Sequence, residues 1–238
     1  MSVRSQPTSC TARTLALFVA SLTLATAVSA DDEVPRVLIL GDSIYQQPAA
    51  EAAKELKDRV DVVFAALQPG EVRNTQNSID NLDRLLGDGR WDVIYFNFGL
   101  GDLIHRAPNM KSFRVMAREA GGVRATGPGQ YERNLHELVD RLQSTDAKLI
   151  WASTTPIRHS TSNVFELGSE IEYNAIAARV MLKHKVPVHD MYSHVRNLID
   201  MDRPASHGAD PFFFDRKPLH PPVVQAILSQ LNPDEPAQ

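Results

Sequence analysis

Cysteine is nearly absent from the chain, since Cys10 is the only one among 238 residues. Because Cys10 lies in the N-terminal leader described below, the rest of the chain can form neither a disulfide nor a cysteine metal site. An excess of basic residues is also lacking, because 25 Lys and Arg stand against 29 Asp and Glu, a net charge of −4. Binding to nucleic acid depends mainly on Lys and Arg that neutralise phosphates, so we expect no nucleic-acid partner.

No glycine-rich phosphate-binding loop follows any of the apolar runs that we interpret as strands. This absence disfavours a nucleotide-binding or flavin-binding protein. The chain has eight histidines, and none of their pairings with other ligand types has a pattern that suggests a metal site. We therefore expect neither a metal nor a cofactor.

The first thirty residues have the pattern of a secretory signal peptide. Arg4 and Arg13 form a positive region, residues 15–28 are apolar, and Val28-Ser29-Ala30 offers small residues for cleavage. The apolar stretch is shorter than the roughly 20 residues that span a bilayer, so we expect no stable membrane anchor. The pattern predicts a secreted or periplasmic protein with residues 1–30 as signal peptide and residues 31–238 as one domain.

Short apolar runs alternate with amphipathic stretches along the rest of the chain. Nearly continuous apolar runs indicate strands that are buried on both faces, and their alternation with helices predicts a parallel sheet covered on both sides. The expected strands are residues 37–40, 60–64, 91–96, 148–152 and 186–188, and the expected helices are residues 49–56, 78–86, 130–143, 166–185 and 222–231. Residues 103–129 fit neither pattern, and we expect a loop that either covers the mouth of a pocket or is a solvated insertion.

Gly41-Asp42-Ser43 directly follows the first expected strand. A serine on the turn that leaves a buried strand is presented to a substrate, and in parallel sheets ligands bind beyond the carboxyl ends of the strands. Near the other end of the chain, His220 offers the base that activates a serine, and Asp215 offers an acid that can orient the imidazole and stabilise its charged form. Gly, Asp and Ser are also common turn residues, so the tripeptide alone is a weak signal.

The chain resembles the SGNH, or GDSL-type, hydrolase family of esterases, lipases and carbohydrate deacetylases. That family has a nucleophilic serine in a Gly-Asp-Ser block, a later Gly-x-Asn-Asp block and a late Asp-x-x-His block. The counterpart of the second block is Gly99-Leu100-Gly101-Asp102, in which Gly101 replaces the asparagine. The resemblance implies a flavodoxin-like three-layer α/β sandwich with a central five-stranded parallel sheet. Further likenesses occur in the family's order at residues 91–94, 131–135, 151–156 and 173–175.

The same resemblance assigns roles to the late block. His220 matches the family's general base because it is the late histidine before the last expected helix. The family places its acid three residues earlier, where this chain has Lys217, so Asp215 is the candidate acid only if the loop bulges. A serine-histidine dyad is the alternative.

The family builds its oxyanion hole from the serine amide, a glycine amide and the asparagine side chain. Here Gly101 can offer only its backbone N–H, and Asn74 is our candidate for the missing donor, with a helix N-cap as an equal alternative. We expect Gly101→Asn to raise turnover if the backbone at Gly101 tolerates a side chain. We expect Asp42 and Asp102 to hold turns rather than to transfer protons.

Together these observations predict a serine ester hydrolase that acts on short acyl esters, acetyl esters of carbohydrates among them, through an acyl-enzyme on Ser43. The altered second block and the displaced acid support a rival from another class, a weak or inactive member of this fold that binds a carbohydrate or protein partner. The oligomeric state does not follow from the sequence.

Overall fold

The computed structural model describes residue 1 and residues 34–110, 113–158, 163–200 and 216–233. The expected signal peptide and Asp215 lie outside these ranges. The contacts group residues 34–238 into one unit, and the fold described below is that of this unit. In the described ranges, no helix is both long enough and apolar enough to cross a membrane.

Five parallel strands form the central sheet, in the order β2-β1-β3-β6-β7. The three middle strands consist almost entirely of buried apolar residues, because helices cover both faces of the sheet. This confirms the predicted three-layer sandwich. The strands are β1 (Arg36–Gly41), β2 (Asp61–Phe64), β3 (Val93–Asn97), β6 (Lys148–Ala152) and β7 (Val188–His189).

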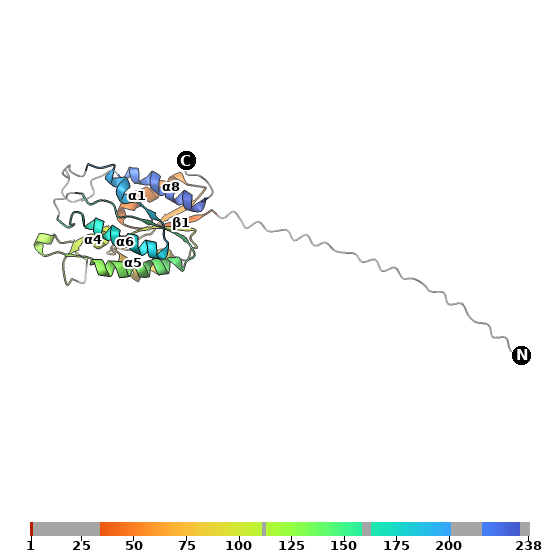
Figure 1. Cartoon of the computed structure of the whole chain (residues 1–238), viewed down its shortest axis with the longest axis horizontal. Helices are drawn as coiled ribbons and strands as arrows, with labels where there is room; N and C mark the ends of the chain where they lie inside the picture. The colour runs from red at the N-terminus through yellow and green to blue at the C-terminus, as the bar shows by residue number, and fades with distance from the viewer. Residues whose placement is uncertain (2–33, 111–112, 159–162, 201–215, 234–238) are drawn as a thin grey trace. The chain divides into compact units, whose positions relative to one another are not determined.

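Helices α1 and α8 lie on one face of the sheet and helices α5 and α6 on the other (Figure 1). Helix α5 packs through a stripe of buried side chains spaced three or four residues apart, including Tyr131, Leu135 and Leu138. The helices are α1 (Gln46–Glu55), α2 (Thr75–Asp80), α3 (Leu82–Leu86), α4 (Leu100–Leu103), α5 (Pro128–Gln143), α6 (Ser169–His184), α7 (Met191–Arg196) and α8 (His220–Leu231), with short 3-10 helices η1 (Ser43–Tyr45), η2 (Arg118–Ala120) and η3 (Lys217–Leu219).

The segment predicted as an irregular loop, residues 103–129, contains a small antiparallel sheet. Strands β4 (His105–Arg106) and β5 (Val123–Arg124) pair with each other, and Arg106 also forms a bridge with Val115.

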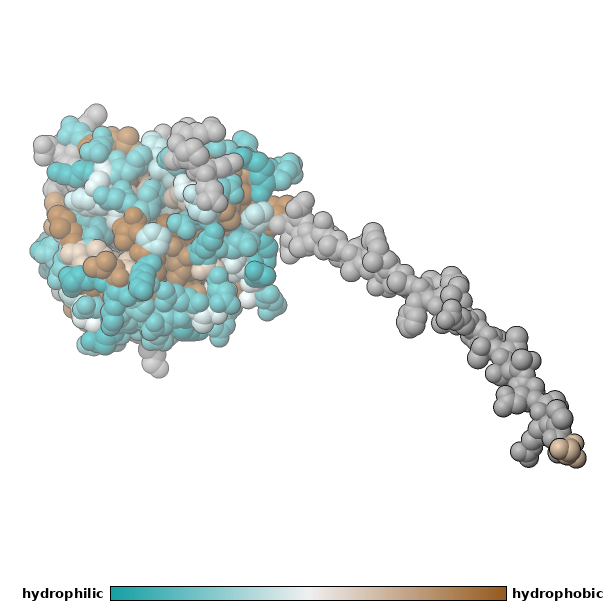
Figure 2. Space-filling model, turned by 45° about the vertical axis from the view of Figure 1, so that its right-hand side comes forward, coloured by the Kyte–Doolittle hydropathy of each residue, from teal (hydrophilic) through white to brown (hydrophobic). Residues whose placement is uncertain are grey.

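The surface seen in Figure 2 is mostly hydrophilic, and its hydrophobic side chains form smaller groups between the hydrophilic ones. The hydrophobic core lies between the sheet and its two helical layers, because the buried apolar side chains come from the strands and from the helices that cover them.

Candidate active site

Ser43 stands at the carboxyl edge of the sheet, on the turn between β1 and helix α1. The turn is tight, because a Cβ at Gly41 would lie 2.2 Å from the carbonyl oxygen of Asn97 on the neighbouring strand. The residues on both sides of Ser43 are buried, whereas Ser43 itself is exposed. Its Oγ forms no hydrogen bond with any described residue, so the hydroxyl is free to meet a ligand.

Asp42 ties the serine turn to the start of helix α4. Its buried carboxylate accepts the backbone N–H groups of Leu100 at 2.9 Å and Gly101 at 3.2 Å. Burial raises the pKa of the Asp42 carboxyl to about 7, although the two N–H groups lower it in part and the nearby Asp102 raises it further. Asp42 therefore holds two chain segments together, as the sequence suggested.

Gly101 lies against the backbone of the segment that carries Arg73. A Cβ at Gly101 would lie 1.8 Å from the carbonyl oxygen of Arg73. The Gly101 N–H, which the sequence offered as an oxyanion donor, is directed to the Asp42 carboxylate in this structure. The space of the family's asparagine side chain is thus filled by backbone.

Asp102 is fully buried and organises the turn before helix α2. Its carboxylate accepts the Thr75 hydroxyl at 2.6 Å and the Thr75 N–H at 3.1 Å. Asn134 of α5 donates in turn to the Thr75 hydroxyl at 2.9 Å. Burial raises the pKa of Asp102 to about 6, against the lowering effect of these hydrogen bonds.

Asn74 is the N-cap of helix α2. Its Oδ1 accepts the backbone N–H of Asn77 at 2.8 Å, the arrangement expected of a capping side chain. Its Nδ2 donates to no described residue. Of the two roles considered for Asn74, the structure shows the cap, and the oxyanion role stays a prediction.

The side chain of Arg73 joins the carboxyl ends of β1 and β2. Its guanidinium donates to the carbonyl of Gly41 at 3.0 Å and to that of Ala65 at 3.2 Å. The guanidinium carbon also lies 4.3 Å from the ring centroid of Phe64. Arg73 therefore supports the residue that begins the serine turn and brings a positive charge close to it.

His220, the predicted base, is the first residue of helix α8. Its Nε2 lies 2.7 Å from Oε2 of Glu55, although the angles are not those of a hydrogen bond. Glu55 is the last residue of α1, and Ser43 precedes the first, so roughly 13 Å of helix separates the two ends. The structure thus places the His220 ring beside Glu55 and not in a hydrogen bond with Ser43.

Glu55 is the site neighbour that the sequence did not reveal, because its position beside His220 depends on the packing of α1 against α8. Five other histidines have hydrogen-bond partners: His105 bonds with the Val164 carbonyl, His136 and His184 with each other, His189 with the Tyr95 hydroxyl, and His194 with the Pro218 carbonyl. Within the described ranges, no three His, Cys, Asp or Glu side chains gather closely enough to hold a metal ion.

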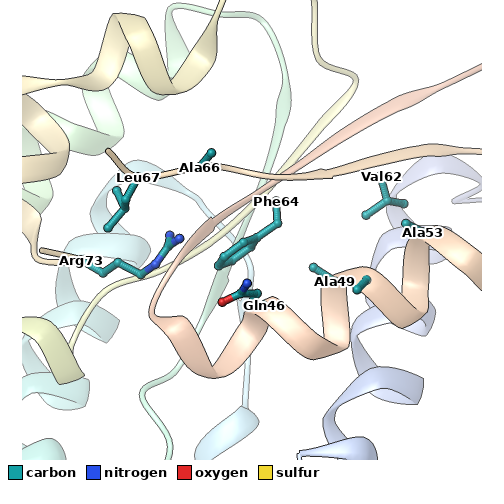
Figure 3. Close-up of a pocket in the computed structure, with 9 residues that line it drawn as sticks. Gln46, Ala49, Ala53, Val62, Phe64, Ala66, Leu67 and Arg73 are labelled. Carbon is teal, nitrogen blue, oxygen red and sulfur yellow. The ribbon is translucent and has the colours of Figure 1, made fainter. Parts of the chain in front are cut away.

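A pocket of about 450 Å³ lies between helix α1 and the edge strand β2 (Figure 3). Gln46 and Arg73 line the end near the serine turn, and alanines of α1 line the rest together with apolar side chains of β2. The volume lies within the range of small-molecule sites.

Comparison with solved structures shows where this fold occurs. A lipase/acylhydrolase from Enterococcus faecalis superposes with a TM-score of 0.61 at 16% identity, covering 85% of this chain and 100% of that one. An acetyl xylan esterase superposes with a TM-score of 0.59 at 15% identity, and the match covers 82% of this chain and 98% of the esterase. A GDSL-like lipase from Bacteroides thetaiotaomicron superposes with a TM-score of 0.53 at 12% identity, and the match covers 82% of this chain and 88% of the lipase.

The chain therefore has the fold of GDSL-type acylhydrolases and acetyl xylan esterases, as the resemblance implied. No protein-family model matches the sequence, and neither does any curated protein.

Proposed function

We propose that this protein is a serine ester hydrolase that removes short acyl groups, with acetyl esters of carbohydrates among its substrates. The observation that carries the proposal is the exposed Ser43, whose Oγ is unbonded among the described residues on a tight strand-to-helix turn. The fold supports it, because proteins that share this fold include acylhydrolases and acetyl xylan esterases.

In the proposed reaction, Ser43 Oγ attacks the ester carbonyl while His220 takes the hydroxyl proton. His220 then gives this proton to the leaving alcohol, and water hydrolyses the acyl-enzyme by the reverse sequence. Asp215 is the candidate acid that orients the imidazole. The Ser43 amide is one donor to the oxyanion, and the Asn74 Nδ2 is the candidate for a second.

This mechanism requires His220 to leave Glu55 and approach Ser43, which takes a movement of the start of helix α8 as well as a turn of the side chain, because Ser43 lies beyond the other end of α1. The Glu55 carboxylate is half-exposed, and contacts of this kind contribute little, about 0 to 1 kcal/mol even when the histidine is charged. Separating the two side chains is therefore energetically accessible. The Gly101 amide would likewise join the oxyanion hole only by leaving Asp42.

A phosphonate probe that labels reactive serines tests the proposal directly. We expect one adduct, located at Ser43 by peptide mass spectrometry, and hydrolysis of p-nitrophenyl acetate that disappears in Ser43→Ala. Ser229→Ala, an exposed serine of α8, is the matched control and should retain full activity. Activity that survives in Ser43→Ala would remove the nucleophile assignment.

A second candidate function is binding of a carbohydrate or protein partner without turnover. Two contacts favour it: Asp42 holds the Gly101 amide, and Glu55 lies against His220. Absence of both the Ser43 adduct and ester hydrolysis, in protein with an intact thermal transition, would make binding the better conclusion.

The N-terminal pattern adds export to the proposal, which places the protein in the periplasm or outside the cell. Intact mass spectrometry of the exported protein should show a chain that begins at Asp31. Exported material that keeps residues 1–30 would contradict cleavage at this site.

A further inference from the structure

One end of the pocket between α1 and β2 lies close to Ser43, because Gln46 at the start of α1 lines it. On helix α1 it is lined by Gln46, Ala49, Ala50 and Ala53, which share one helix face by their spacing of three and four residues. Ser43 begins the 3-10 helix η1, which leads directly into α1, and it precedes Gln46, the first residue of α1, by three residues, a spacing that places side chains on the same side of a 3-10 turn. The nucleophile therefore stands above the first residue of the pocket.

The opposite wall of the pocket comes from the edge strand. Val62 and Phe64 alternate along β2, so they face the same side of the sheet, toward helix α1. The pocket has its width because α1 carries alanines there, and Ala50 is exposed while Ala53 is half-buried. A longer side chain at either position would fill the space.

The polarity of the pocket changes along its length. Gln46 and Arg73 lie at the Ser43 end, whereas Ala53 and Val62 lie at the far end (Figure 3). The Arg73 guanidinium already donates to the Gly41 and Ala65 carbonyls and lies over Phe64, so it is held in place as part of the wall at this end. A ligand that is polar at one end and an unbranched hydrocarbon at the other fits this gradient.

We propose that this pocket binds the acyl chain of the ester that Ser43 attacks. The inference rests on the proposed function, and it adds the determinant of acyl length. From Gln46 to Ala53 the helix rises about 10 Å, so the pocket takes linear acyl chains up to about octanoyl size. The chain lies along α1 with its carbonyl at the Ser43 end.

Chain-length profiles test the proposal. We would measure kcat/KM on p-nitrophenyl acetate and p-nitrophenyl octanoate for the wild type, Ala50→Leu and Ala53→Leu. The octanoate-to-acetate ratio should fall about tenfold or more in each variant, the loss expected when about two methylene groups can no longer be buried. Ala178→Leu, an exposed alanine on helix α6, is the matched control and should leave the ratio unchanged.

A binding measurement separates this inference from the proposed hydrolysis. In Ser43→Ala protein, sodium octanoate should shift the amide NMR signals of Ala49, Ala50 and Ala53, and sodium acetate should not. If no ester is hydrolysed but octanoate still shifts these signals, the hydrolase proposal fails and the pocket stands only as a site that binds a hydrocarbon chain. If esters are hydrolysed with the same length profile in all variants and octanoate shifts no pocket signal, the acyl pocket is overturned.

Discussion

The carbonyl oxygen of Arg73 occupies the space that a side chain at Gly101 would need. The distance from this oxygen to a Cβ built on Gly101 would be 1.8 Å, and the Asn74 backbone nitrogen would lie 3.1 Å away. Both contacts involve backbone, which cannot turn aside as a flexible side chain does. Position 101 is therefore glycine because two chain segments meet there.

The first prediction concerns Gly101→Asn. The sequence suggested that this change would raise turnover if the backbone tolerated a side chain, and the structure contradicts that condition. We now expect no gain in turnover and a loss of stability of at least about 1 to 3 kcal/mol, as for other overpacked sites. Thermal unfolding with a p-nitrophenyl acetate assay checks both expectations.

Gly129→Ala is the matched control for Gly101→Asn. Gly129 lies in helix α5, where an added Cβ would meet only Arg133 Nη1 at 3.7 Å, and alanine favours helix. The control should be as stable as the wild type or more so. A Gly101→Asn protein that melts like the wild type and turns over faster would restore the original interpretation.

The second prediction separates the two roles of Asn74. Asn74→Ala removes the cap on helix α2 and should cost about 1 kcal/mol of stability. Asn74→Ser keeps a capping oxygen but removes the Nδ2 donor, so its stability should stay close to that of the wild type. If Nδ2 serves the oxyanion, kcat falls in both variants, by up to about 10² to 10³. Loss of kcat in Asn74→Ala alone would mean that Asn74 acts only as a cap.

The third prediction concerns Glu55. Because Glu55 lies against the ring of His220, Glu55→Gln should free the imidazole and raise kcat by up to about fivefold, the factor that corresponds to a contact of about 1 kcal/mol. Glu51→Gln, one turn earlier on α1 and exposed, is the matched control and should not change kcat. Steady-state kinetics on p-nitrophenyl acetate provide the measurement.

The opposite result for Glu55→Gln would also be informative. If this variant loses as much activity as His220→Ala, Glu55 is the acid that orients the base, and the role given to Asp215 falls. Equal activity of the wild type and both glutamine variants would show that the Glu55 contact has no part in the reaction.

The strands could be predicted from the sequence because a strand buried on both faces is a nearly continuous apolar run. All five expected strands are present, with shifts of a few residues at their ends. The expected helix at residues 78–86 is two helices, α2 and α3. The break falls at Asn81, whose side chain donates to the Asn77 carbonyl and thus competes with helical hydrogen bonding.

The candidate site was less predictable, because its contacts join segments far apart in the chain. Ser43 could be recognised from its place after a strand. The contact of Gly101 with Arg73, the hydrogen bonds from α4 to Asp42, and the pairing of His220 with Glu55 each depend on how separate elements pack. A local pattern holds no information on such contacts, so the sequence named most of the residues but not their partners.

The last prediction is a pH dependence of stability that comes from Asp42. Burial raises the pKa of this carboxyl from 3.8 to about 7, so the folded chain holds the proton more tightly than the unfolded chain. The resulting stabilisation is complete below about pH 4 and is lost as the pH rises to about 7. The pKa of Asp102 is raised from 3.8 to about 6, so this carboxyl adds a further decline in stability over the narrower range from about pH 4 to about pH 6.

Asp42→Asn removes the first of these two contributions, because an amide does not titrate. The free energy of unfolding, measured with urea at pH 4.5 and at pH 7.5, should fall with pH less steeply in the variant than in the wild type. The difference should be at least about 1.4 kcal/mol, the value of one pKa unit. Asp88→Asn, at an exposed aspartate, is the control and should keep the wild-type slope. Equal slopes in Asp42→Asn and the wild type would mean that the Asp42 carboxyl titrates as it does in the unfolded chain, and that its two N–H partners fully offset its burial.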